Sequence, residues 1–79
     1  MHLPPPGLDA FRRHVADRMR TVRLWRNLTQ EQLAHLAGVA PRTVVSIESG
    51  RHGFSTDVLY ALARALDVTV SELVADDRT

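Results

Sequence analysis

The chain has 79 residues, which is enough for one small domain, and its net charge at pH 7 is +1. It contains no cysteine, which excludes disulfide frameworks, zinc–thiolate sites and thiol catalysis. No apolar run reaches the roughly 20 residues of a membrane span, and the first residues, MHLPPPG, have neither the basic nor the apolar region of a signal peptide. We therefore expect a soluble cytoplasmic domain without a membrane partner.

Positive charge is concentrated in the first part of the chain. Up to residue 51 there are eight arginines and four acidic residues, whereas the remainder has two arginines and five acidic residues. This asymmetry predicts one surface that binds a polyanion such as nucleic acid and another that faces away from it.

Residues 1–7 contain three consecutive prolines and a glycine, which predict an extended tail rather than a helix. The apolar residues that follow recur three or four positions apart, as they do along one face of a long helix. They are Leu8, Phe11, Val15, Met19 and Val22. We expect this helix to end near Asn27, because asparagine tolerates the left-handed conformation that follows many helices.

Two short helices are predicted next. Thr29 and Gln32 have the spacing of a capping box, and Gly38 marks the end of the helix that the box begins. Pro41 suits the first position of the following helix, because its missing N–H would have no intrahelical partner there. That helix is expected to end at residues 49–50.

The last third of the chain predicts two more helices. Gly53 and Ser55 mark a loop, after which the apolar residues keep the helical period. Thr69 and Glu72 form a second capping box, which begins a short final helix. The apolar residues of these two helices are Leu59, Leu62, Ala63, Leu66, Val70, Leu73 and Val74.

No segment shows the sustained alternation of a β-strand, so the predicted fold class is all-α, with five helices joined by short turns. We divide the chain into an extended tail over residues 1–7, one helical domain over residues 8–75 and a C-terminal tail over residues 76–79.

The stretch between residues 28 and 50, LTQEQLAHLAGVAPRTVVSIESG, resembles the lambda-repressor/Cro-like helix-turn-helix family, also called the XRE family. The motifs that carry the resemblance are Leu28-Thr29-Gln30, Leu33-Ala34, Gly38-Val39, Val44-Val45 and Ile47-Glu48-Ser49-Gly50. It extends over roughly residues 15–75, and so long a match with correct spacing is specific. The resemblance implies a compact lambda-repressor-like domain whose second and third helices form the helix-turn-helix. The third helix would then lie in the major groove of double-stranded DNA.

Helical geometry assigns the exposed face of the third helix. At about 100° per residue, Val44 and Ile47 define its buried side. The residues that then face away from the core are Arg42, Val45, Ser46 and Ser49. The resemblance implies that this face meets base edges. Arginine reads guanine O6 and N7 bidentately, valine suits a thymine methyl group and serine suits several bases. The alternative for Arg42 is a solvated surface arginine.

Further residues are expected at the DNA backbone. The resemblance implies that Gln30, at the start of the second helix, contacts a phosphate and braces the recognition helix. Its alternative is a solvent-exposed residue of the first turn. Thr43, Arg51 and His52 are further phosphate candidates, since backbone contacts set the register of a protein on DNA without reading its sequence.

Arg23 and Glu48 correspond to a family pair that links the first helix to the end of the third, the alternative being two unrelated surface charges. Two positions depart from the family pattern. Ala40 replaces the usual capping residue before the third helix, at a typical cost of about 1 kcal/mol, and Pro41 takes a base-facing position where relatives often have a polar side chain. Asn27 replaces a glycine. These changes affect base preference rather than the fold.

These features predict a sequence-specific, nucleoid-associated transcriptional regulator, a repressor that binds a palindromic operator as a homodimer and needs no cofactor. The apolar stripe of the last helix, Val70, Leu73 and Val74, offers a subunit contact. The alternative is that this stripe closes the core of the monomer. Trp25 covers either the edge of the core or a subunit contact, and the sequence leaves both open.

The sequence bears on two other classes of function. Catalysis is disfavoured, because the four histidines (His2, His14, His35 and His52) lack metal-ligand spacing and the glycines end or separate helices instead of forming a phosphate loop. No metal is therefore expected. An interaction module remains the alternative function, such as an antitoxin that uses the fold mainly to hold a protein partner.

Overall fold

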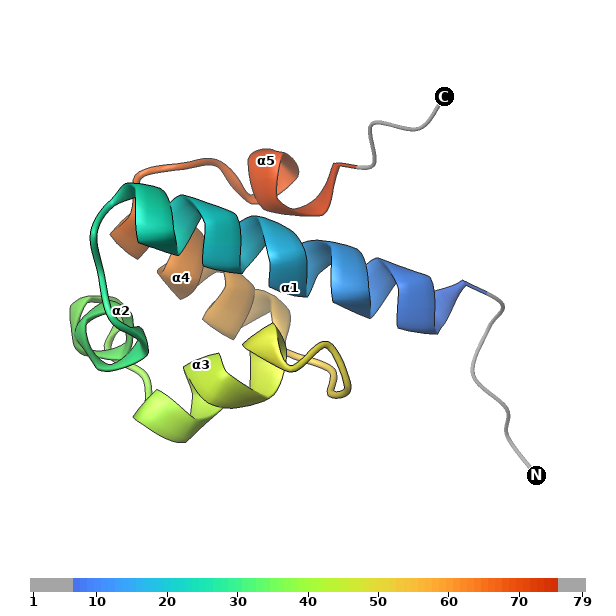
Figure 1. Cartoon of the computed structure of the whole chain (residues 1–79), viewed down its shortest axis with the longest axis horizontal. Helices are drawn as coiled ribbons and strands as arrows, with labels where there is room; N and C mark the ends of the chain where they lie inside the picture. The colour runs from blue at the N-terminus through green and yellow to red at the C-terminus, as the bar shows by residue number, and fades with distance from the viewer. Residues whose placement is uncertain (1–6, 76–79) are drawn as a thin grey trace.

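The computed structural model describes residues 7–75, which form five helices and no strand (Figure 1). The helices are α1 (Leu8–Trp25), α2 (Gln30–Ala37), α3 (Pro41–Glu48), α4 (Thr56–Leu66) and α5 (Val70–Val74). The all-α prediction and the order of the five helices are thereby confirmed. Apart from Gly7, the predicted tails lie outside the described residues.

Both predicted capping boxes are formed. The Thr29 hydroxyl accepts a hydrogen bond from the Gln32 N–H at 3.0 Å, and the Gln32 side-chain oxygen accepts one from the Thr29 N–H at 2.8 Å. Thr69 and Glu72 repeat this arrangement at the start of α5, at 3.0 and 3.1 Å. Each box gives partners to backbone N–H groups that the first turn leaves unbonded. These two helix starts are therefore set by local sequence.

Left-handed residues other than glycine follow two of the helices. Asn27 follows α1 with φ 58°, as predicted for the position where the family has glycine. Asp67 follows α4 with φ 59°, an end that the sequence pattern did not indicate. At the start of α3, Ala40 makes no side-chain cap and Pro41 takes the first helical position. The fixed φ of proline is preorganised for this turn, so α3 begins without a capping oxygen.

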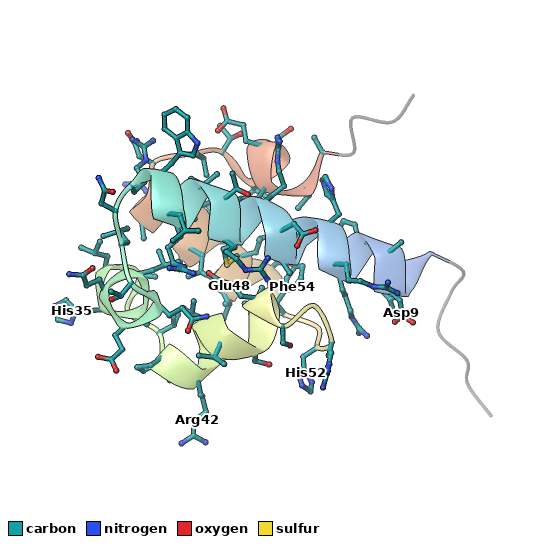
Figure 2. All side chains as sticks on the ribbon, viewed as in Figure 1. Asp9, His35, Arg42, Glu48, His52 and Phe54 are labelled. Carbon is teal, nitrogen blue, oxygen red and sulfur yellow. The ribbon has the colours of Figure 1, made fainter. Side chains whose placement is uncertain are left out.

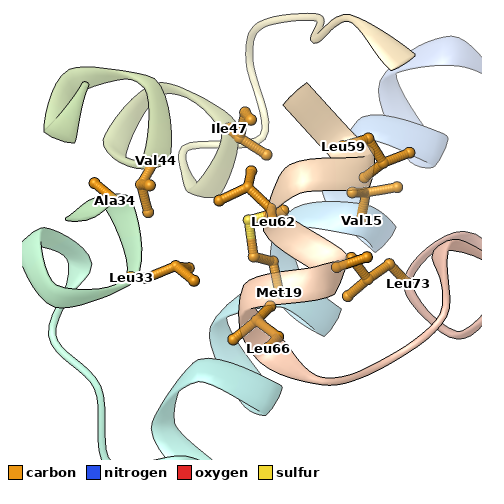
Figure 3. Packing of buried hydrophobic residues seen from close by; sticks show 11 residues of the cluster. Val15, Met19, Leu33, Ala34, Val44, Ile47, Leu59, Leu62, Leu66 and Leu73 are labelled. Atoms are coloured by element: carbon orange, nitrogen blue, oxygen red, sulfur yellow. The ribbon is translucent and has the colours of Figure 1, made fainter. Parts of the chain in front are cut away.

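Every helix contributes apolar side chains to one core (Figure 3). α1 packs against both α3 and α5, and α2 packs against α3 and α4. Burying each large aliphatic side chain contributes about 1.5–3 kcal/mol relative to leaving it exposed. The core residues are Val15, Met19, Leu33, Ala34, Val44, Ile47, Leu59, Leu62, Ala63, Leu66 and Leu73.

The apolar stripe of α5 closes the core of the monomer. Leu73 is fully buried, and Val70 and Val74 are partly buried against the core. The expectation that this stripe forms a subunit contact is therefore wrong for Leu73. A helix of five residues is unstable alone, and it gains its stability by inserting this side chain between α1 and α4.

Two side chains of α1 also hold the carboxyl-terminal end of α5. The His14 ring donates from Nε2 to the carbonyl of Ala75, and Arg18 Nε donates to the carbonyl of Glu72 at 3.0 Å. Carbonyls in the last turn of a helix lack intrahelical partners. α1 therefore supplies partners that a five-residue helix lacks.

The turn after α3 passes close to α1 at Gly50. This residue has φ 73°, and a Cβ placed on it would lie 3.1 Å from Cγ of Arg13 and 3.4 Å from its Cα. A side chain at this position would both strain the backbone and press against α1. Glycine therefore allows the loop that follows α3 to lie against the first half of α1.

Candidate nucleic-acid interface

The outer face of α3 carries the residues predicted to meet base edges. Val44 and Ile47 are buried, at 0% and 2% exposed, whereas Val45 is 50% exposed. Arg42 is exposed and extends away from the helices, at the edge of the molecule that α3 forms (Figure 2). No residue between 7 and 75 forms an ion pair with it. An unpaired guanidinium on an open helix face is available for bidentate binding to an external acceptor.

The remaining predicted contacts lie beside this face. Pro41 is exposed in the first turn of α3, and Thr43 is half-buried. Arg51 and His52 are exposed in the loop after α3, and His52 extends to the same side of the molecule as Arg42 (Figure 2). A groove separates α3 from the start of α4. It is lined by Arg42, Thr43, Ser46, Ile47, Gly53, Phe54, Ser55 and Val58.

Glu48, the last residue of α3, is 4% exposed and bonds this helix to its neighbours. Its carboxylate accepts two hydrogen bonds from Arg23 of α1, from Nε at 2.8 Å and from Nη2 at 2.9 Å. These bonds raise the pKa of Arg23 above its ordinary value, and burial of the guanidinium opposes part of that rise. The two residues placed together from the family resemblance thus form a bidentate ion pair between α1 and the end of α3.

Both members of this ion pair also bond to the segment at the start of α2. Gln30 donates from its amide to Glu48 Oε1 at 3.2 Å. Arg23 donates from Nη1 to the carbonyl of Leu28 at 2.9 Å. Arg20 adds a bond to the backbone carbonyl of Glu48 at 2.6 Å. The Gln30 side chain therefore braces α3, while a phosphate contact from it stays a prediction. Sequence reasoning missed Arg20 and the Leu28 carbonyl, because nothing local in the chain places them near α3.

The structure of residues 7–75 bears on two other kinds of site. No group of three histidine, cysteine or acidic side chains is arranged to hold a metal ion in this part of the chain. None of its helices is long and apolar enough to cross a bilayer. Trp25, whose role the sequence left open, is 82% exposed at the end of α1, so it does not cover the core.

Residues 19–73 match the family model described as Helix-turn-helix. This chain belongs to the XRE-type helix-turn-helix family. That assignment confirms the resemblance, and it agrees with the expectation that the domain is not an enzyme, since the family consists of regulators.

The chain is similar to proteins with named roles. The immunity repressor protein of Bacillus phage phi105 is 36% identical over 63 residues, which cover 80% of this chain and 44% of the repressor. The transcriptional repressor RstR of the cryptic phage CTXphi in Vibrio cholerae is 31% identical over 64 residues, 81% of this chain and 58% of that protein. The chain therefore spans about half the length of these two relatives.

A solved structure of similar length supports the fold. The restriction-modification controller protein C.AhdI from Aeromonas hydrophila superposes with a TM-score of 0.78 at 34% identity, over 81% of this chain and 97% of the controller. The present fold thus matches the controller over nearly its whole length.

Proposed function

We propose that this chain is a sequence-specific, double-stranded DNA-binding transcriptional regulator that acts as a homodimeric repressor on a palindromic operator at the nucleoid. The observation that carries the proposal is the open face of α3, where Arg42 has no anionic partner among residues 7–75 while the helix itself is held rigidly through Glu48. A braced helix with an exposed reading face is what major-groove recognition requires. Similarity to a phage immunity repressor and to a controller protein supports a regulatory role.

Base reading is proposed for the residues on this outer face. Arg42 is placed to bind guanine, Val45 to contact a thymine methyl group, and Ser46 to hydrogen-bond several bases. Pro41 adds an apolar surface at the front of the helix. Phosphate contacts are proposed for Gln30 at the start of α2, Thr43 in α3, and Arg51 and His52 in the loop after α3.

Binding to duplex DNA is expected to weaken steeply as salt concentration rises. Neutralising about four to six phosphates per dimer releases condensed counterions, so log K should fall with log salt with a slope of about −4 to −5. Fluorescence anisotropy of a labelled duplex, measured across a salt series, gives this slope. The same titration with the single strand is the control. A flat response, or a preference for the single strand, would contradict major-groove docking by α3.

A homodimer is expected in solution at tens of micromolar protein. We propose the exposed side of α5 and the adjoining surface of α4 as the contact, where Tyr60 is 57% exposed beside Val70. α1 lies between α5 and α3 (Figure 1), so pairing through α5 leaves the reading face free. Sedimentation equilibrium should report twice the chain mass of 8.8 kDa. Finding only monomers, both free and on operator DNA, would refute the dimer.

One observation favours the alternative function of an interaction module. Trp25 and Leu24 are 82% and 58% exposed at the end of α1. Neighbouring exposed apolar side chains are typical of protein–protein contact surfaces. A folded protein that lacks duplex binding at every salt concentration would support this function over DNA recognition.

A further inference from the structure

The arginines of α1 fall into two groups with different surroundings. Those toward its carboxyl-terminal end bond within the domain: Arg18 to the Glu72 carbonyl, Arg20 to Asp17 and Glu48, and Arg23 to Glu48. Arg26, the residue after the helix, likewise donates to the Leu66 and Asp67 carbonyls. Arg12 and Arg13, nearer the start of α1, form no ion pair or hydrogen bond with any residue between 7 and 75. Asp9 lies one helical turn before Arg12 and Arg13 and forms an ion pair with neither.

Arg12 is the more unusual of the two. Its Nε is buried and has no acceptor. Buried donors are nearly always hydrogen-bonded, because a donor removed from water without a partner loses free energy. No acceptor for this donor lies among residues 7–75, so the Arg12 guanidinium is available to an anion from outside this part of the chain.

The loop after α3 brings further positive charge to the same place. A Cβ on Gly53 would lie 3.1 Å from Nη2 of Arg12, so the guanidinium lies against the loop backbone. The rings of Phe11 and Phe54 have centroids 6.3 Å apart, and the turn at Gly50 packs on α1. Three contacts thus hold residues 50–54 against the first half of α1, on the side that faces α3 (Figure 1).

This packing produces a basic cluster, which we define as Arg12, Arg13, Arg51 and His52. We propose that Arg12 and Arg13 bind phosphates of the DNA duplex that α3 reads, and so extend the backbone contacts beyond the helix-turn-helix onto α1. The inference rests on the proposed DNA-binding function. Guanidinium groups bind phosphate oxygens bidentately, and the cluster is continuous with the side of the molecule to which His52 and Arg42 extend (Figure 2).

Salt dependence tests the inference with three variants that each remove one positive charge. Arg12→Gln and Arg13→Gln should each reduce the magnitude of the log K against log salt slope by about 0.9 per bound subunit. Arg26→Gln is the control, because Arg26 follows the opposite end of α1, where its guanidinium donates to the Leu66 and Asp67 carbonyls. This control should keep the log K against log salt slope of the unaltered protein. Selected-site profiles should stay unchanged in all three, since phosphate contacts do not read sequence.

The outcomes separate this inference from the proposed function. If the unaltered protein binds duplex DNA with a steep slope while Arg12→Gln and Arg13→Gln behave as Arg26→Gln does, the α1 contact is wrong and the proposed function stands. If the unaltered protein shows no salt-dependent binding, both fail. Circular dichroism checks folding. Should the Arg12 variant unfold because its Nε is buried, the exposed side chain of Arg13 decides the result by itself.

Discussion

Replacing Glu48 by alanine is expected to lower the free energy of unfolding by about 3–5 kcal/mol, since it leaves the charge of Arg23 buried without its partner. Arg23 is 9% exposed and donates two hydrogen bonds to this carboxylate, and Gln30 donates a third. Small domains have a total stability of about 5–15 kcal/mol, so this one change would remove a large share. Urea denaturation followed by circular dichroism measures the loss.

Glu31→Ala is the matched control for this prediction. Glu31 is an exposed acidic residue of α2, so its replacement makes the same change in net charge without touching the buried pair. Surface changes of this kind usually stay within about 0.5 kcal/mol. A double replacement, Arg23→Met with Glu48→Leu, should recover much of the loss, because apolar residues of similar size remove the unpaired charge. Equal effects of Glu48→Ala and Glu31→Ala would show that the pair does not stabilise the domain.

Arg42→Ala is expected to relax base preference at one position of each operator half-site by roughly ten- to a hundredfold. A lost bidentate guanine contact removes about 1–3 kcal/mol of discrimination. Arg42 extends from the open face of α3 and contributes nothing to the core, so the variant should fold normally (Figure 2). Selection of bound sites from a random duplex library, followed by sequencing, measures the change at each base position.

Gln30→Ala and Arg51→Ala serve as the comparison for Arg42. We expect both to weaken binding to all sequences together and to keep their ranking, because phosphate contacts carry no direct sequence information. The Gln30 variant also loses the hydrogen bond to Glu48, and so one of the contacts that hold α3 in place. Arg51 is exposed in the loop and gives the cleaner comparison. If Arg42→Ala keeps the unaltered profile at every position, Val45 and Ser46 take over the role of reading bases.

Local sequence was sufficient to predict the five helices and most of their ends. The capping boxes at Thr29 and Thr69 involve residues only three positions apart, and backbone hydrogen bonds to Arg23 and Leu24 close the left-handed turn at Asn27. The buried side of α3 follows from helical periodicity, which places Val44 and Ile47 together without reference to other helices. All these features depend on residues within a few positions of one another, so the local sequence determines them.

Only the tertiary structure decided which polar and apolar groups meet across helices. The sequence left α5 either as a subunit contact or as part of the core, and packing against α1 and α4 buried Leu73 completely. Likewise, all the arginines of α1 carry the same charge, yet Arg23 reaches a carboxylate 25 positions away while Arg12 and Arg13 meet none among residues 7–75. Periodicity gives the direction of a side chain around its own helix axis. What that side chain meets depends on how the helices are docked, because those partners lie far apart along the chain.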